Sequence, residues 1–287
     1  MKQLTVISGK GGTGKTTIAA SFAALAGSKV MADCDVDAAD LHLLLRPEIR
    51  REERFEGRAV PVIQEDQCIQ CGRCMEACRF DAIHDYVVDP IACEGCMLCR
   101  WVCPVEAIGT QETISGSWFI SDTRYGPMVH AKLDIAQENS GKLVTMVRQQ
   151  ARLMAEREGL DYVLIDGPPG IGCPVISAIT GVDRVLVVTE PTLSGIHDLE
   201  RILGVAAHFG IGGMVCINKY DLNRANTDAI RRFCDEKGVP VVGEIPFDPL
   251  VVDALVNART VVEIGNSPVA EEIRRMWDRV HQALSTS

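Results

Sequence analysis

Ser8-Gly9-Lys10-Gly11-Gly12-Thr13-Gly14-Lys15-Thr16-Thr17 is the stretch from which the fold of this chain is predicted. It follows an apolar run, Leu4 to Ile7, that predicts a β-strand, and it leads into Ile18 to Ala26, which predicts a helix. The G-x-x-x-x-G-K-T spacing from Gly9 to Thr16 matches the phosphate-loop pattern in the strand–loop–helix setting that this pattern requires. The stretch therefore predicts a nucleotide phosphate site.

The chemistry of such a loop follows from its residue types. Glycines let successive backbone N–H groups turn toward an anion, and the helix N-terminus adds partial positive charge. Lys15 is expected to reach the β- and γ-phosphates, and the Thr16 hydroxyl to bind Mg²⁺. The residues expected to contact the nucleotide from this loop are Gly9, Lys10, Gly11, Gly12, Thr13, Gly14, Lys15, Thr16 and Thr17.

An early lysine, Lys10, distinguishes this loop. Lys-Gly-Gly-Thr-Gly-Lys-Thr-Thr resembles the deviant phosphate loop of the MinD/ParA/Mrp and nitrogenase iron-protein superfamily. The resemblance implies a doubly wound, mostly parallel α/β fold that binds ATP. It also implies a nucleotide-dependent homodimer, or a heterodimer with a paralogue, in which Lys10 reaches the partner's nucleotide and acts with Lys15 in catalysis.

Carboxylates follow two predicted parallel strands, where they face the ligand crevice. The resemblance implies that Asp33 and Asp166 help to hold Mg²⁺ and that Asp35 orients the attacking water. Asp37 is open between a role in this site and a helix cap. The loop Gly167–Gly172 after Asp166 resembles switch II of the superfamily, which senses the γ-phosphate.

Residues 60–110 carry an internal repeat of cysteines. The spacing C-x2-C-x2-C-x3-C occurs twice, at Cys68, Cys71, Cys74 and Cys78, and again at Cys93, Cys96, Cys99 and Cys103. The repeat resembles the bacterial ferredoxin domain with two [4Fe–4S] clusters. Because the fourth cysteine of each motif points away from the other three, we expect one cluster on Cys68, Cys71, Cys74 and Cys103, and the other on Cys93, Cys96, Cys99 and Cys78. Structural zinc is disfavoured, because this spacing suits cubane clusters better.

The predicted domain organisation follows. Residues 1–59 and 111–287 form the nucleotide-binding domain, and residues 60–110 form an inserted α+β ferredoxin domain. Arg79 stands where the second copy has Pro104, and the sequence does not decide whether this cation raises the potential of the nearer cluster or is solvated.

Composition and charge narrow the classes of protein to which this chain can belong. A net charge of −10 and a pI near 5.1 argue against a nucleic-acid surface. The chain opens on a predicted strand without a signal peptide, and no apolar run reaches transmembrane length, so we expect a cytoplasmic protein. Twelve cysteines then indicate metal or redox chemistry rather than disulfides. The apolar stripe of residues 270–284 is expected to pack on the sheet rather than to form a stable membrane anchor.

Several local predictions complete the chain. The charged stretch 46–58 is expected to be a solvated connector, with an edge strand left open. Residues 116–121 and 127–133 predict two antiparallel strands. Cys173 is expected to pack behind switch II, and a role in a bridging cluster or metal site is the less favoured alternative. Asn218-Lys-Tyr-Asp221 matches the N-K-x-D pattern of GTPases, which alone favours GTP, whereas the deviant phosphate loop favours ATP with Asn218 on the adenine. We expect ATP.

Three functions remain open at this stage. The first is ATP hydrolysis that controls electron transfer through two [4Fe–4S] clusters to a redox acceptor protein. The second, by resemblance to Mrp-type proteins, is a carrier or maturation factor that passes an iron–sulfur cluster or metal to a client protein. The third is a positioning ATPase of the ParA or MinD type.

Overall fold

The computed structural model describes residues 1–134 and 140–286, and the chain divides into two compact units. Unit 1 comprises Met1–Glu52, Trp118–Lys132 and Ser140–Ser287, and unit 2 comprises Glu53–Ser117 and Leu133–Asn139. The domain boundaries expected at residues 60 and 110 stay a prediction.

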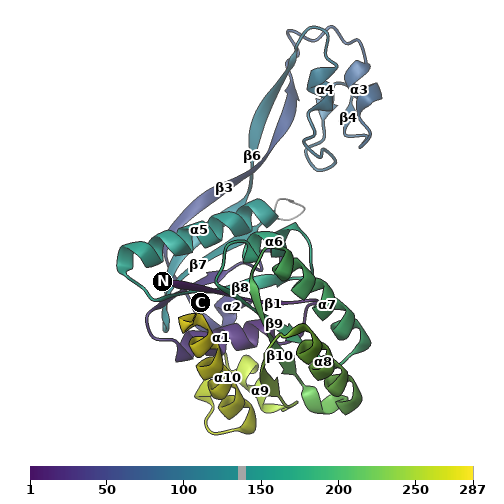
Figure 1. The fold of residues 1–287 in the computed structure, drawn as a ribbon. Helices are drawn as coiled ribbons and strands as arrows, with labels where there is room; N and C mark the ends of the chain where they lie inside the picture. Colours follow the sequence, from purple (N-terminus) through teal and green to yellow (C-terminus); the bar gives the residue numbers. More distant parts are fainter. Residues whose placement is uncertain (135–139, 287) are drawn as a thin grey trace. The chain divides into compact units, whose positions relative to one another are not determined.

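Unit 1 is an α/β unit in which strands and helices alternate along the chain (Figure 1). Its main elements are β1 (Lys2–Ser8), α1 (Lys15–Leu25), β2 (Lys29–Asp33), α2 (Leu41–Leu45), β7 (Gly126–Leu133), α5 (Ser140–Glu158), β8 (Tyr162–Pro169), α6 (Cys173–Ile179), β9 (Arg184–Thr189), α7 (Leu193–His208), β10 (Gly212–Asn218), α8 (Arg224–Lys237), β11 (Val241–Ile245), α9 (Leu250–Val256) and α10 (Pro268–Ser285). Short 3-10 helices span Tyr220–Leu222 and Val261–Glu263.

The strands form one sheet in the order β11-β10-β9-β1-β8-β2-β7-β6-β3. β1 lies between β8 and β9 and runs parallel to both, and β2 runs parallel to β8 and β7. The carboxyl ends of these parallel strands therefore meet at one edge, where an open α/β sheet binds its ligand. In this register Asp33 on β2 is the direct neighbour of Asp166 on β8.

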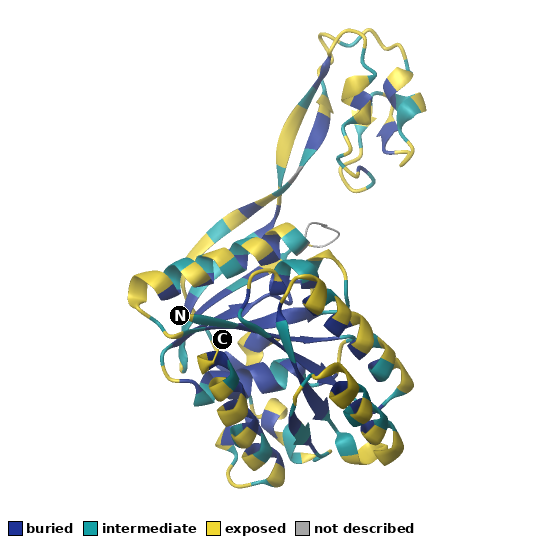
Figure 2. Cartoon of the chain, viewed as in Figure 1, coloured by how far each residue is buried: buried dark blue, intermediate teal, exposed yellow. Residues whose placement is uncertain are grey.

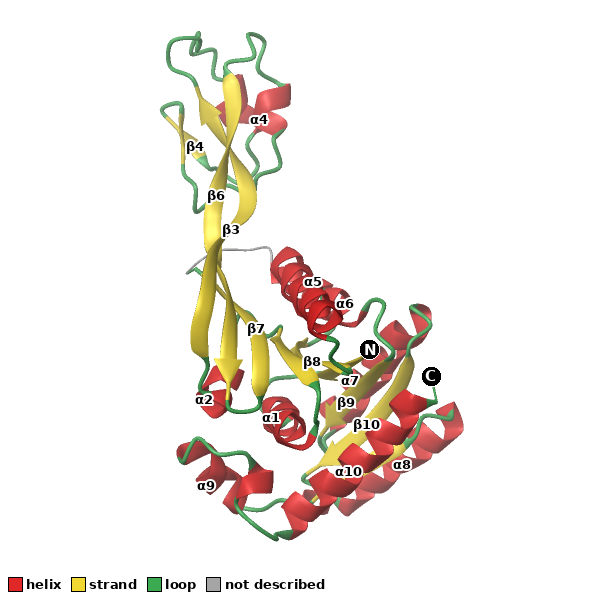
Figure 3. Cartoon of the chain, turned by 90° about the vertical axis from the view of Figure 1, so that its left-hand side faces the viewer, coloured by secondary structure: helices red, strands yellow, loops and turns green. Residues whose placement is uncertain are grey.

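Helices cover both faces of the sheet. Leu4 belongs to a buried cluster with Phe22 of α1 and Trp277 of α10, whose rings lie 5.0 Å apart. The next residue, Thr5, points to the other face, where its Oγ1 donates to the carbonyl of Ala178 in α6 at 2.8 Å. Figure 3 shows α1 and α5 on opposite sides of the sheet, and Figure 2 shows the central strands as buried. The predicted doubly wound, mostly parallel fold is confirmed.

The apolar stripe of the last helix is buried, as predicted. In α10 the fully or nearly buried side chains are Ile273, Met276, Trp277, Val280 and Leu284. They join the same core cluster as Leu4 and Phe22, so this face of the helix is covered by unit 1 itself. No helix in the described part of the chain combines the length and the apolarity that a membrane crossing requires.

A long edge strand replaces the connector predicted over residues 46–58. β3 spans Glu48–Ile63 and is the last strand in the sheet order, beside β6 (Ile108–Thr123). Charged side chains on an edge strand remain solvated and discourage pairing with other chains. The edge strand that the sequence left open is therefore what forms from residue 48 onward, in place of an irregular connector. A two-residue turn at Arg124–Tyr125 joins β6 to β7.

Unit 2 contains the cysteine repeat and little regular structure. Besides its parts of β3 and β6 it holds α3 (Arg73–Ala77), β4 (Ile83–His84), β5 (Val87–Val88) and α4 (Leu98–Trp101). The repeat is visible in the backbone: α3 follows Gly72 and α4 follows Met97, and both preceding residues adopt the left-handed conformation. Equivalent positions of the two cysteine motifs therefore begin equivalent helical turns.

His130 on β7 gives unit 1 a predicted acid sensitivity. Its Nε2 lies 2.9 Å from Ser121 Oγ, and burial lowers its pKa from 6.5 to about 4, with His42 acting in the same direction. Between these values the unfolded chain binds a proton that the folded chain does not, so stability falls as the pH drops through this window. On going from pH 7 to pH 4, the unfolding free energy of the parent protein should fall further than that of His130→Gln. We expect the difference between the two decreases to be about 2 kcal/mol. Urea unfolding at several pH values measures it, with the exposed His208→Gln as control; equal pH slopes in all three proteins would contradict it.

Candidate functional site

The phosphate loop has the backbone that its glycines predict. Gly12 and Gly14 adopt left-handed φ values of 79° and 89°, which side chains other than glycine rarely take. A Cβ at Gly14 would also lie 2.5 Å from Asn218 Nδ2. That amide donates to the carbonyl of Thr13 at 2.7 Å. Asn218 at the end of β10 therefore braces the loop just before α1 begins.

Lys15 lies at the centre of a buried charge cluster. Its Nζ lies 2.8 Å from Asp166 Oδ1 and 3.3 Å from Asp35 Oδ2, and the residue is 5% exposed. Burial lowers the pKa of Lys15, but the charges of Asp166 and Asp35 outweigh it, so the net shift is upward. Lys15 is thus held as a cation at the point where the loop would meet phosphate.

Asp33 completes this cluster from β2. It is 1% exposed, and its Oδ1 accepts a hydrogen bond from the backbone N–H of Asp35 at 3.2 Å. Burial, followed by the charge of Asp166, raises the pKa of Asp33 well above its usual range. Burial also raises the pKa of Asp35. The three carboxylates that the sequence selected therefore surround the single ammonium group of Lys15.

Two of these carboxylates keep an oxygen without a partner. Within residues 1–134 and 140–286, Asp33 Oδ2, Asp166 Oδ2 and the hydroxyl of Thr13 are buried without a hydrogen bond. Buried polar atoms are normally satisfied, so orphaned acceptors in a cluster indicate a missing electropositive partner. Carboxylate oxygens are donors that Mg²⁺ prefers, so Asp33 and Asp166 fit the predicted ion. The third predicted ligand is Thr16 rather than Thr13, and its hydroxyl lies 3.3 Å from Lys15 Nζ.

A cavity of about 590 Å³ opens beside the loop. The predicted site residues that line it are Gly11, Gly12, Thr13, Gly14, Lys15, Thr16, Thr17, Asp35 and Asn218. Pro246 and Phe247, after β11, form part of its apolar wall. Gly9, Lys10, Asp33 and Asp166 lie outside this lining. A cavity of this size, with phosphate-binding groups at one end and apolar side chains at the other, suits a nucleotide.

Glu190 is a member of the site that the sequence analysis missed. It follows β9, and its Oε2 lies 3.6 Å from Lys10 Nζ while its Oε1 lies 2.6 Å from Lys219 Nζ. The available signal was its position after a buried parallel strand, the same position that selected Asp33 and Asp166. It therefore joins the phosphate loop to the segment after β10.

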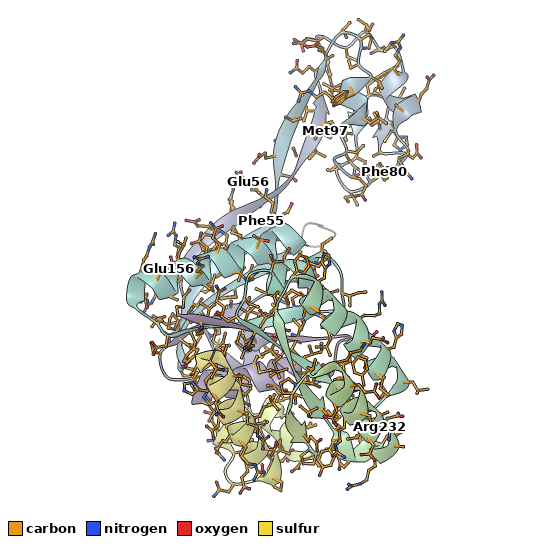
Figure 4. The ribbon with its side chains drawn as sticks, viewed as in Figure 1. Phe55, Glu56, Phe80, Met97, Glu156 and Arg232 are labelled. Carbon is orange, nitrogen blue, oxygen red and sulfur yellow. The ribbon has the colours of Figure 1, made fainter. Side chains whose placement is uncertain are left out.

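In unit 2 the eight cysteines gather around two small cavities, each of about 20 Å³. One is lined by Cys68, Cys71, Cys74 and Cys103, and the other by Cys78, Cys93, Cys96 and Cys99. Figure 4 labels Phe80 and Met97, which line the second cavity. Each group thus takes three cysteines from one motif and the last cysteine of the other, which is the grouping that the sequence predicted for cluster ligands.

Backbone N–H groups point at equivalent sulfur atoms in both motifs. The N–H of Gln70 lies 3.4 Å from Cys68 Sγ, and that of Gly95 lies 3.4 Å from Cys93 Sγ. The last cysteines, Cys78 and Cys103, likewise accept from the residues four positions on, at 3.4 and 3.3 Å. Among the described residues, no group of three or more His, Cys, Asp or Glu side chains could hold a single metal ion.

Cys173 is exposed at the start of α6, so the prediction that its thiol packs behind switch II was wrong. The reason lies in β8, which continues through Pro169 and leaves only residues 170–172 before α6. The predicted loop Gly167–Gly172 is correspondingly shorter. The other cysteines outside the repeat, Cys34, Cys216 and Cys234, are buried.

Comparisons with known proteins agree with this geometry. Residues 4–261 match the family model described as the CobQ/CobB/MinD/ParA nucleotide binding domain. An uncharacterized protein of Methanocaldococcus jannaschii is 32% identical over 286 residues, which cover 98% of this chain and 97% of that protein. The cell division ATPase MinD of Pyrococcus furiosus superposes with a TM-score of 0.61 at 19% identity, covering 98% of each chain. MinD of Pyrococcus horikoshii, solved with Mg-ADP, gives a TM-score of 0.60 at 20% identity, covering 97% of this chain and 95% of that one. The phosphate loop, the buried lysine–carboxylate cluster and the matched family model together show that this chain belongs to the CobQ/CobB/MinD/ParA family of nucleotide-binding proteins.

Proposed function

We propose that this chain is an ATP-hydrolysing switch of the MinD/ParA type that closes as a dimer around nucleotide and opens after hydrolysis. The observation that carries the proposal is Lys15, buried beneath the phosphate loop and paired with Asp35 and Asp166. The relatives support the ATPase, and they fit a MinD/ParA-type role better than they fit electron transfer.

Each residue of the site has a distinct task in this proposal. The loop N–H groups bind the phosphates, and Lys15 neutralises charge that develops on the transferred group. Asp35 orients the attacking water, while Lys10 of one protomer adds positive charge at the nucleotide of its partner. Mg²⁺, held by Thr16, Asp33 and Asp166, would neutralise phosphate oxygens when bound.

The contacts of Asp221 support ATP over GTP. In a GTPase the last residue of N-K-x-D uses its carboxylate to accept hydrogen bonds from guanine. Here Asp221 Oδ1 accepts instead from the backbone N–H of Phe247 at 2.7 Å, and Phe247 lines the cavity. The carboxylate is therefore engaged in shaping the base pocket. Asn218 at the start of the motif is positioned on the loop at the cavity wall, where adenine is expected.

Asp35→Asn tests the water-orienting role. The amide is isosteric, but it cannot accept a proton or orient water as a carboxylate does, so we expect ATP binding to persist and turnover to fall by about 100-fold. Equilibrium binding of a fluorescent ATP analogue and steady-state phosphate release separate the two effects. Asp37→Asn is the matched control, because Asp37 is exposed, lies outside the cavity lining and is not the cap of α2, which is Asp40. Unchanged turnover in the Asp35 variant would remove Asp35 from this role.

We further propose that unit 2 binds two [4Fe–4S] clusters and passes electrons toward a partner protein. The support is the grouping of the eight cysteines around two separate cavities and the backbone N–H groups directed at their sulfur atoms. In such a cluster each cysteine binds a different iron, so the four thiolates surround a cube rather than one ion. When bound, the clusters would supply one-electron transfer.

Nucleotide control of that transfer is the link between the two units. In the sequence, unit 2 is inserted between Asp35 and the switch II segment after Asp166, the two places where hydrolysis acts. We expect the reconstituted protein to reduce an acceptor at different rates with ATP, with ADP and without nucleotide. Equal rates under all three conditions would remove the coupling.

The other two roles remain distinguishable by experiment. Transfer of a cluster to an apo-acceptor, with loss of iron from this chain, would indicate a carrier or maturation factor of the Mrp type. ATP-dependent pelleting with vesicles or DNA would indicate positioning of the MinD or ParA type. The acidic net charge of −10 and the burial of the apolar stripe of α10 weigh against such surfaces.

A further inference from the structure

Glu190 holds two lysines, Lys10 of the phosphate loop and Lys219 of the segment after β10. Its side chain is only 13% exposed, and each carboxylate oxygen faces a different cation. Lys219 Nζ lies 2.6 Å from Oε1, within hydrogen-bond distance, whereas Lys10 Nζ lies 3.6 Å from Oε2. The two contacts are therefore unequal: Lys219 is bound tightly, and Lys10 is held by a longer, purely ionic contact.

The lysine with the longer contact is also the more exposed of the two. The Lys10 side chain is 41% exposed, and that of Lys219 is 31% exposed. An ion pair at such a position is screened by solvent and contributes little stability, so a stronger anion displaces it easily. A nucleotide triphosphate is a stronger anion than one carboxylate.

We propose that Glu190 is a latch that retains Lys10 against its own protomer and thereby sets the ATP concentration at which the dimer closes. The inference rests on the proposed function, because it requires that Lys10 act on the partner's nucleotide. A Lys10 paired with Glu190 is not available to a second protomer. Closure must therefore break this contact, while Lys219 keeps Glu190 compensated after Lys10 leaves.

The size of the effect follows from the symmetry of the dimer. One exposed ion pair contributes up to about a fivefold change in an equilibrium constant. Two latches open for each dimer that forms, so the factor is squared. Removing Glu190 should lower the dimer dissociation constant in ATP by up to about 25-fold.

The test uses the full chain in an Asp35→Asn background, where slow hydrolysis preserves the ATP state. Analytical ultracentrifugation with ATP and Mg²⁺ gives the dimer dissociation constant. We expect Glu190→Gln to tighten the dimer and Glu190→Asp, which keeps the charge on a shorter side chain, to lie between it and the parent. Glu200→Gln, an exposed carboxylate on α7, removes the same charge and should leave the constant unchanged.

A double variant assigns the effect to Lys10. In a Lys10→Met background there is no lysine to retain, so Glu190→Gln should no longer tighten the dimer. A Glu190 effect that persists there, or an unchanged constant in Glu190→Gln alone, overturns the latch and leaves the proposed function standing. If the parent dimerises with ATP and Lys10→Met dimerises equally well, the proposed role of Lys10 fails and the latch fails with it. A protein that stays monomeric with ATP in every variant overturns both.

Discussion

Lys15→Met should abolish ATP binding, with a loss of affinity of at least about 100-fold, because it removes the phosphate-loop cation that pairs with the buried carboxylates Asp35 and Asp166. The same change should also lower the unfolding free energy at neutral pH by about 3 kcal/mol, since Asp35 and Asp166 would remain buried without their partner. Isothermal titration with ATP and urea unfolding measure the two effects.

The stability of Lys15→Met should depend on pH in a direction that tests this explanation. The carboxylates left without a cation become neutral on protonation, so the stability deficit of Lys15→Met should shrink as the pH falls below about 6. Lys2→Met is the matched control, because Lys2 pairs with Asp183 at 3.4 Å with both side chains about 30% exposed. It should change stability by less than about 1 kcal/mol. A Lys15 variant that is as stable as the control at neutral pH would contradict the buried cluster.

The second large effect concerns iron. Protein that has been reconstituted anaerobically with iron and sulfide should hold about eight iron atoms per chain, which is the content of two [4Fe–4S] clusters. A variant with Cys93→Ser, Cys96→Ser and Cys99→Ser removes the three cysteines of the second motif that line one cavity. It should lose one cluster and keep about four iron atoms per chain. The other cavity keeps its four thiols, so the remaining iron should stay in a cubane site. Iron analysis and the visible absorption spectrum measure this.

The exposed Cys173 provides the control for cysteine chemistry outside the repeat. Cys173→Ser should keep the full iron content, because this thiol lies in α6 of unit 1. A parent protein that remains colourless after reconstitution, or that retains zinc instead, would remove the clusters from the account. A Cys173 variant that loses iron would mean that the cysteine grouping is incomplete.

Much of unit 1 could be predicted because its signals are local. The phosphate loop fixes a strand before it and a helix after it, and β1, β2 and α10 appear where the apolar patterns place them. Asp33 and Asp166 are neighbours in the sheet register. The sequence placed both at the ends of buried strands, and the family resemblance supplied their expected role. Parallel topology converts that shared sequence position into spatial contact.

The errors occurred where tertiary context decides. The charged residues of β3 suggest a connector, yet an edge strand solvates them equally well, so charge alone does not discriminate. Cys173 depends on how far β8 continues, and Gly167-Pro-Pro-Gly170 suggests an earlier end than Pro169. Glu190 could not be ranked above other acids, because its importance comes from two lysines that are distant from it in the sequence.

ATP turnover per chain, measured over a range of protein concentrations, tests the central claim most directly. A switch that hydrolyses ATP only as a dimer, with Lys10 of each protomer acting on the other's nucleotide, predicts turnover per chain that rises with concentration and reaches a plateau. It also predicts that Lys10→Met stays near background at every concentration. Turnover per chain that is independent of concentration and unaffected by Lys10→Met, or no hydrolysis of ATP at all, would contradict the account.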